Sequence, residues 1–202
     1  MKVTAPEFQQ WERFYRANFI NSLSGYKSAS LIGTCNAGKQ TNLAIFSNIV
    51  HLGADPALIG FINRPLAASV HTISNIEETG YYTINHIHPG MVERAHQTSA
   101  KYPQEISEFD ATLLAEEWTD FPAPYVKESF VKYGLKYAET IRIERNNTFL
   151  VIGEIVEVYL PDAVVQPDGF IALEDAHSVA SLGLDSYYLP KLLNKFKYAK
   201  PQ

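Results

Sequence analysis

Residues 135–160, with the sequence LKYAETIRIERNNTFLVIGEIVEVYL, indicate the fold most strongly. Apolar and polar side chains alternate over 135–144, and Asn146 and Asn147 precede a second, largely apolar run over 148–160. Alternation with a period of two is typical of a strand, and turn residues between two such runs are typical of a hairpin. We therefore predict a long antiparallel β-hairpin here.

Further strands are predicted upstream of this hairpin, each as a short apolar or β-branched run beside Gly, Pro or Asn. They span 28–35, 41–48, 57–63 and 81–87, and a turn at 36–39 joins the first two. Helices are predicted within 8–26, 70–78 and 91–101 and, after a loop, over 189–198. Many strands joined by short turns favour a closed or partly closed antiparallel barrel, which is a mainly β fold with peripheral helices.

The length and composition suit one domain. The chain has 202 residues, of which 46% are hydrophobic and 19% charged, and this composition excludes a disordered protein. We expect a single domain over 1–202 with an N-terminal arm at 1–25 and a C-terminal helical tail at 182–202. The acidic, loop-like segment 103–124 is expected to be a lid or an insertion.

Net charge and cysteine content limit which partners the protein can bind and which cellular compartment it suits. A net charge of −5 does not provide the basic surface that nucleic-acid binding needs. The single Cys35 cannot form an internal disulfide or a multi-thiolate zinc site, which fits a reducing compartment. The N-terminus lacks the apolar core of a secretory leader, and Glu154 and Glu157 interrupt the most apolar run. We expect a cytoplasmic protein with no membrane segment.

A phosphate-binding loop is suggested by GTCNAGK at 33–39, which has the glycine and lysine spacing of that motif. The motif also needs Ser or Thr next and then a helix, but Gln40 follows and the chain continues with strand-like alternation. We therefore interpret 33–39 as the end of a strand and a hairpin turn.

Histidines and nucleophile motifs give no catalytic assignment. The imidazoles of His86 and His88 share one face of the strand predicted near 81–87. A metal site could in principle be completed by His51, His71 or His96, but no Cys or carboxylate stands at a metal-site interval. No Gly-x-Ser-x-Gly elbow is present in the sequence. We predict no metal site and assign no catalytic residue.

A distributed set of small, hydroxyl and amide side chains suggests a site for a flat anionic ligand. Small side chains let a ring lie against the backbone, Ser, Thr and Asn bond polar ring atoms, and Arg beside a helix N-terminus neutralises phosphate. The set consists of Thr41, Asn42, Ala44, Ser47 and Asn48, then Arg64, then His71 and Thr72 at the start of a predicted helix. The alternative is that these are ordinary strand-face and capping residues.

At these positions the chain resembles the flavin reductase-like family of FMN-binding split barrels, which includes the flavoredoxins. The resemblance runs in order from residue 26 to about 198. It rests on six stretches: KSASLIGTCNAGKQTNLAIFSNI at 27–49, DPALI at 55–59, Arg64-Pro65 with His71-Thr72, TGYYTIN at 79–85, SAKYP at 99–103 leading to Glu108-Phe109, and GLDSYY at 183–188. The family implies an antiparallel split β-barrel.

The resemblance also implies a homodimer in which FMN lies in a groove near the subunit interface. The strand after the first turn would contact FMN through Thr41, Asn42, Leu43 and Ala44, and the ribityl and phosphate groups would face Ser47 and Asn48. The phosphate would be held by Arg64 and Thr72. The site would be bordered by Asn85, His86 and Lys101.

The activity implied by the resemblance is hydride transfer from NADH or NADPH to FMN, followed by electron transfer to free flavin, a partner protein or another acceptor. A flavoredoxin-like electron carrier without direct NAD(P)H activity is the first alternative, because no Gly-x-Gly-x-x-Gly fingerprint follows a strand. The second is a split-barrel binding module for haem or another ligand, with His86 or His88 as the ligand.

Overall fold

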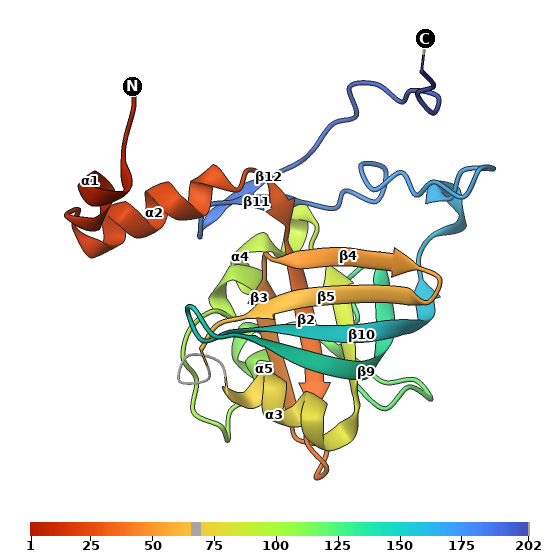
Figure 1. Ribbon diagram of the computed structural model, residues 1–202. Helices are drawn as coiled ribbons and strands as arrows, with labels where there is room; N and C mark the ends of the chain where they lie inside the picture. Colours follow the sequence, from red (N-terminus) through yellow and green to blue (C-terminus); the bar gives the residue numbers. More distant parts are fainter. Residues whose placement is uncertain (66–69, 202) are drawn as a thin grey trace.

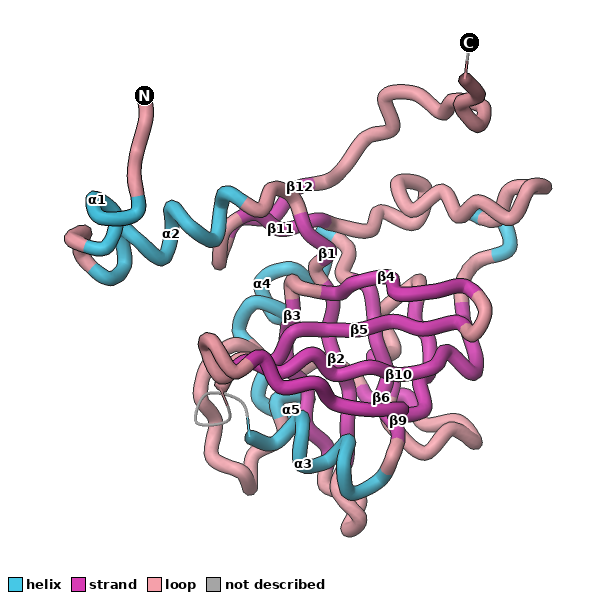
Figure 2. The backbone as a smooth tube through the Cα atoms, in the orientation of Figure 1, coloured by secondary structure: helices cyan, strands magenta, loops and turns pink. Residues whose placement is uncertain are grey.

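The computed structural model describes residues 1–65 and 70–201, and its body is a strongly bent antiparallel sheet (Figures 1 and 2). Seven strands pair in the order β3-β2-β6-β9-β10-β5-β4, so β3 and β4 form its two edges. Strands β4, β5, β10 and β9 lie in one layer, and β2 and β3 cross behind them (Figure 1). The strands are β2 Ser30–Cys35, β3 Thr41–Phe46, β4 Ile49–Ala54, β5 Ala57–Asn63, β6 Tyr81–His86, β9 Lys132–Ile143 and β10 Thr148–Tyr159. The predicted mainly β split barrel is confirmed.

Helices and two small sheets surround this barrel. Short 3₁₀ turns at Pro89–Met91 and Asp162–Val164 accompany them. The helices are α1 Ala5–Gln9, α2 Arg13–Leu23, α3 Val70–Thr79, α4 Val92–Gln97 and α5 Glu108–Thr112. One small sheet pairs β1 Lys27–Ser28, β11 Ala180–Leu182 and β12 Ser186–Tyr188, and the other pairs β7 Glu116–Glu117 with β8 Tyr125–Val126. No helix in the described part of the chain combines the length and apolarity needed to cross a bilayer.

The secondary structure follows the sequence predictions closely in the barrel. The predicted hairpin at 135–160 is β9 and β10, which pair from Thr148↔Ile143 to Tyr159↔Lys132. Strand β4 was not predicted, because its sequence IVHLGA has no clear alternation and most of its side chains are exposed. In the 36–39 turn, Lys39 has a positive φ of 64°, in the left-handed region that favours Gly and Asn.

The predicted helical tail at 182–202 is wrong. Residues 182–188 complete the β11–β12 hairpin, and the described residues after β12 contain no helix. Leu193 and Phe196 of this stretch are exposed. A helix of about ten residues is marginal in water unless tertiary packing stabilises it, and no such packing is present here.

Two apolar cores lie on the two faces of β2. Ile32 faces the barrel interior, where it packs with residues of four other strands and with Ile73 and Ile76 of α3. Leu31 faces the other way, toward α4 and α5. Because every residue of β2 is buried, its sequence SLIGTC lacks the alternation of a strand with one wet face.

Close backbone packing explains the glycine at position 33. A Cβ on Gly33 would collide with the Pro124 carbonyl and lie 2.7 Å from the Thr83 hydroxyl oxygen. The Thr83 hydroxyl donates to that carbonyl at 2.6 Å, so the segment that covers β2 is itself fixed. The 103–124 segment therefore ends against the barrel wall.

The N-terminal arm differs from the barrel. Helices α1 and α2 project away from the barrel and contain no buried residue (Figure 1). Trp11 packs edge-on against Tyr15 and Phe19, at ring-centroid distances of 4.9 and 5.0 Å. Within the described chain the arm packs mainly against itself.

Candidate functional site

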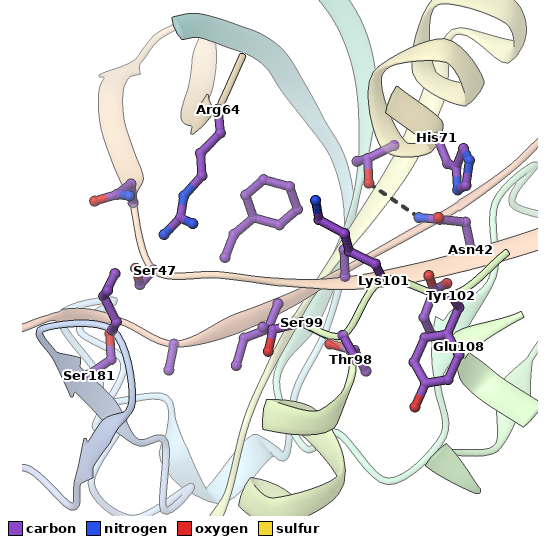
Figure 3. A pocket seen from close by; sticks show the side chains of 18 of the residues that line it. Asn42, Ser47, Arg64, His71, Thr98, Ser99, Lys101, Tyr102, Glu108 and Ser181 are labelled. Carbon is purple, nitrogen blue, oxygen red and sulfur yellow. Dashed lines mark hydrogen bonds between the residues drawn. The ribbon is translucent and has the colours of Figure 1, made fainter. Parts of the chain in front are cut away.

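A cavity of about 360 Å³ lies beside edge strand β3 (Figure 3). This volume is within the usual range of small-molecule sites. Its walls come from β3 and the two residues after it, the end of β5, the start of α3, the segment 98–102 after α4, Glu108 of α5, and the β11–β12 hairpin. Elements that are far apart in the sequence thus meet at one site.

One end of the cavity is cationic. Arg64 follows β5, and in Figure 3 its guanidinium points toward Ser47, which follows β3. Asn48 lines the same cavity. A guanidinium beside hydroxyl and amide groups is suited to a phosphate, because Arg forms charge-assisted, two-point hydrogen bonds with phosphate oxygens.

The other end is built on a buried hydrogen-bond network between β3 and α3. The Asn42 amide nitrogen donates to the Thr72 hydroxyl at 3.2 Å and to the Thr34 hydroxyl at 3.4 Å (the first bond is drawn in Figure 3). Asn75 also donates to Thr34, at 3.1 Å. These bonds fix the orientation of Asn42 and tie the start of α3 to the sheet.

Glu108 is a buried carboxylate on the wall of this second end, with 7% of its surface exposed. Its Oε2 accepts the backbone N–H of Leu43 at 2.9 Å. Burial raises the pKa of the Glu108 carboxyl, while the hydrogen bond from Leu43 and the nearby His71 act in the opposite direction. The side chain therefore links α5 to β3 at the edge of the cavity.

The segment 98–102 follows the C-terminal end of α4 and lines the cavity. The Thr98 hydroxyl donates to the Ala95 carbonyl at 2.8 Å. Lys101 follows and, in Figure 3, lies between the Arg64 end and the Glu108 end. Tyr187 of β12 bonds His96 of α4 at 2.9 Å, which fastens the small sheet to the same helix.

Seven of the eleven residues implied by the resemblance line this cavity: Asn42, Ala44, Ser47, Asn48, Arg64, Thr72 and Lys101. The other four, Thr41, Leu43, Asn85 and His86, do not. Alternation along β3 separates Asn42 and Ala44 from Leu43, because neighbouring side chains in a strand point to opposite faces.

The four residues outside the cavity have other roles. Thr41 bonds Ser107 and Glu116 beside a second recess, and Leu43 is fully buried in the core. Asn85 is fully buried and accepts the Val126 N–H at 2.9 Å, a bond that fixes the segment covering the barrel. The side chains of these three residues therefore do not line the cavity beside β3.

His86 is the fourth, and it packs away from the cavity against Tyr133. Its Nδ1 lies 3.1 Å from the Ser178 hydroxyl, and burial lowers the pKa of His86 to about 4. His88 stacks on Phe130, so neither histidine that we considered as a haem ligand lines the cavity. No cluster of three metal-ligating side chains occurs within 1–65 and 70–201.

The sequence did not identify several wall residues as ligand contacts. Ser99, Ala100 and Tyr102 stand within or beside the SAKYP stretch, but only tertiary structure shows that they face the same space as His71, which the sequence had included in the ligand set. Further wall residues include Ala29, Ile62, Thr98, Glu108, Ser181, Leu184 and Tyr187. No local pattern distinguishes them, because their neighbours in the cavity are remote in sequence.

Comparison with known proteins gives a family match over most of the chain. A family model described as "Flavin reductase like domain" matches residues 23–177. An uncharacterised protein of Aquifex aeolicus is 24% identical over 161 residues, which are 78% of this chain and 81% of that protein.

Solved structures with the same fold include one with high sequence identity. A proposed flavin reductase with a split barrel domain from Shewanella frigidimarina is 50% identical, with a TM-score of 0.95 over 98% of this chain and all of that chain. Nitrilotriacetate monooxygenase component B from Bacillus cereus is 18% identical, with a TM-score of 0.82 over 98% of each chain. Flavoredoxin of Desulfovibrio vulgaris is 20% identical, with a TM-score of 0.75 over 96% and 97% of the two chains.

Proposed function

The chain belongs to the flavin reductase-like domain family, and on that premise we propose that it is an NAD(P)H-dependent flavin reductase with FMN as its cofactor. The family supports a flavin-related oxidoreductase. The observation that carries the finer proposal is the cavity, which combines a cationic end at Arg64 with small wall residues and a polar second end.

The residues of the cavity fit FMN. Arg64, Ser47 and Asn48 would hold the phosphate, and Ala44 and Ala100 leave room for a planar ring against the backbone. Because Lys101 lies between the two ends, its ammonium group can reach either the ribityl chain or the ring (Figure 3). The ring would then lie at the end formed by Asn42 and Glu108, opposite Arg64.

FMN held in this cavity would supply the redox chemistry, which is hydride uptake from NADH or NADPH and electron transfer to free flavin, a partner protein or another acceptor. The protein binds and orients the ring. The hydrogen bonds between Asn42 and Thr72 and between Glu108 and Leu43 fix the wall around it. Tyr187 and Leu184 of the small sheet exclude water from one side.

We also propose that the chain acts as a homodimer. The N-terminal arm exposes Phe14 and Leu23, and the C-terminal segment exposes Leu193, Phe196 and Tyr198. Exposed apolar patches of this kind usually mark an interaction surface. The cytoplasmic location inferred from the sequence stays a prediction.

Anaerobic addition of NADH or NADPH to the FMN-loaded protein tests the reductase. We expect rapid loss of the oxidised flavin absorbance with at least one of the two donors, far faster than with free FMN. FMN that binds but is reduced only by a chemical reductant would contradict NAD(P)H dependence and favour the electron carrier. A Soret band in the isolated protein would instead favour a haem-binding module.

A further inference from the structure

The two ends of the cavity differ in what they offer a ligand. At the Arg64 end, the guanidinium is a hydrogen-bond donor. At the other end, the Asn42 amide nitrogen donates to Thr72 and Thr34, and the Thr98 hydroxyl donates to Ala95, so these donors are used within the protein. This second end therefore presents hydrogen-bond acceptors to a ligand, alongside the side chains of Lys101 and His71.

Glu108 is the strongest of these acceptors. Its Oε2 takes the N–H of Leu43 at 2.9 Å, whereas its Oε1 takes no hydrogen bond from any other residue in 1–65 or 70–201. The side chain is more than nine-tenths buried and lines the cavity. A ligand N–H that reaches this oxygen would form a charge-assisted hydrogen bond, so a ligand that brings an N–H to it would be favoured.

The polar edge of an oxidised flavin matches this arrangement. That edge presents a carbonyl, an imide N–H and a second carbonyl in sequence. Glu108 can accept the N–H, while Lys101 and His71, which line the same cavity, can donate to carbonyl oxygens (Figure 3). With the phosphate at Arg64, the imide edge reaches the Glu108 end.

We propose that Glu108 is a specificity-determining residue that accepts the imide N–H of the bound flavin ring. This inference rests on the proposed function, because it assumes that the cavity binds FMN. Leu43 and Glu108 then act together: the backbone N–H of β3 holds one carboxylate oxygen so that the other faces the ring.

The experiment compares FMN with 3-methyl-FMN, in which a methyl group replaces the imide hydrogen. Both dissociation constants are measured by fluorescence titration for the wild-type protein, for Glu108→Gln and for Asp110→Asn. Gln can still accept from Leu43 but turns an NH₂ group toward the ring. Asp110 is an exposed carboxylate on the same helix, so it is a matched control.

We expect the wild type and Asp110→Asn to bind FMN about 10- to 100-fold more tightly than 3-methyl-FMN, as for a hydrogen bond to a charged acceptor. In Glu108→Gln this ratio should fall close to one, mainly through weaker binding of FMN. Circular dichroism confirms folding, and Glu108→Asp replaces the Gln variant if that variant does not fold. The shorter Asp cannot reach Leu43 and the ring together, so the same loss of the ratio is expected.

Two results would overturn the inference. One is equal affinity of the wild type for both flavins, and the other is an unchanged ratio in a folded Glu108 variant. In either case FMN still binds, so the proposed function stands. A wild-type protein that binds neither flavin would instead contradict the proposed function.

Discussion

The barrel buries its apolar side chains within one chain, whereas the two terminal segments leave theirs in solvent. Ile32 and Phe61 of the barrel are fully buried, while Phe14 in the arm and Leu193 near the C-terminus are 70% and 97% exposed. Both regions are rich in aromatic and aliphatic residues. Composition alone therefore does not separate the part of the chain that makes the core from the part that needs another surface.

This difference explains how the cavity is held. Residues on β3, such as Asn42 and Ala44, have positions fixed by the two cores on either side of the sheet. The β11–β12 hairpin, which supplies Tyr187, is attached through β1 and through His96 to the same body. The cavity therefore belongs to the barrel region, and the arm and the final residues lie outside it. Each of the following variants tests this division.

The largest effect is expected inside the barrel wall, for Gly33→Ala. The added Cβ would collide with the Pro124 carbonyl, a backbone atom that cannot easily move. We expect the free energy of unfolding to fall by about 3 kcal/mol, measured by urea denaturation. Gly38→Ala in the adjoining turn is the control, because its new Cβ would meet only the side-chain oxygen of Asn36 at 3.3 Å. Equal stability of the two variants would show that β2 is not packed as described.

Arg64→Ala tests an exposed residue that belongs to the cavity. We expect FMN binding to weaken by about 2 kcal/mol, roughly 30-fold, because one charge-assisted phosphate contact is lost. Stability without FMN should hardly change, since Arg64 is on the surface. Arg142→Ala, at an exposed arginine that pairs with Glu144 and Asn147, is the control. An unchanged dissociation constant for Arg64→Ala would contradict the phosphate assignment.

The pH dependence of stability tests the burial of His86. Its pKa in the folded protein, about 4, lies below the ordinary value of 6.5, so the unfolded chain binds more protons between these values. The contribution of His86 to stability is therefore complete above pH 6.5 and is lost as the pH falls toward 4, by about 1.4 kcal/mol per pH unit.

Denaturation midpoints measured across this range, for the wild type and His86→Phe, check this expectation. The slope assigned to His86 should disappear in His86→Phe and persist in His51→Gln, because His51 is exposed on β4. The same slope in all three proteins would mean that another group is responsible.

The smallest effect on the barrel is expected from removal of residues 1–25. The described helices of the arm bury no residue, so the unfolding free energy of the barrel should change by less than about 0.5 kcal/mol. In contrast, the molar mass measured by light scattering should fall from that of two chains to that of one. A large loss of stability with an unchanged mass would show that the arm packs on its own barrel.

The sequence predicted the parts of the fold that depend on local patterns. The hairpin at 135–160 alternates and carries its own turn, and 57–63 coincides with β5. The helix predicted over 189–198 does not form, because a short amphipathic segment needs a surface to pack on before it is stable as a helix. Strand β4 was not predicted because most of its side chains are exposed and its sequence has no clear alternation of apolar and polar residues.

In the candidate site too, residues that stand out locally in the sequence could be predicted, whereas residues whose role depends on tertiary packing could not. Arg64 could be predicted because it is a conspicuous cation between a predicted strand and a predicted helix. Glu108 could not, because its role depends on the backbone of Leu43, which lies 65 positions earlier in the chain. Asn85 was included for its place in a matching stretch, but tertiary packing uses its amide to bind Leu31 and Val126.

The central claim is that the cavity beside β3 binds FMN, and a titration of the purified protein with FMN, followed by flavin absorbance and fluorescence, tests it most directly. We expect saturable binding of one FMN per chain, weakened by Arg64→Ala and unaffected by Arg142→Ala. A colourless protein that takes up no FMN during the titration would contradict the claim.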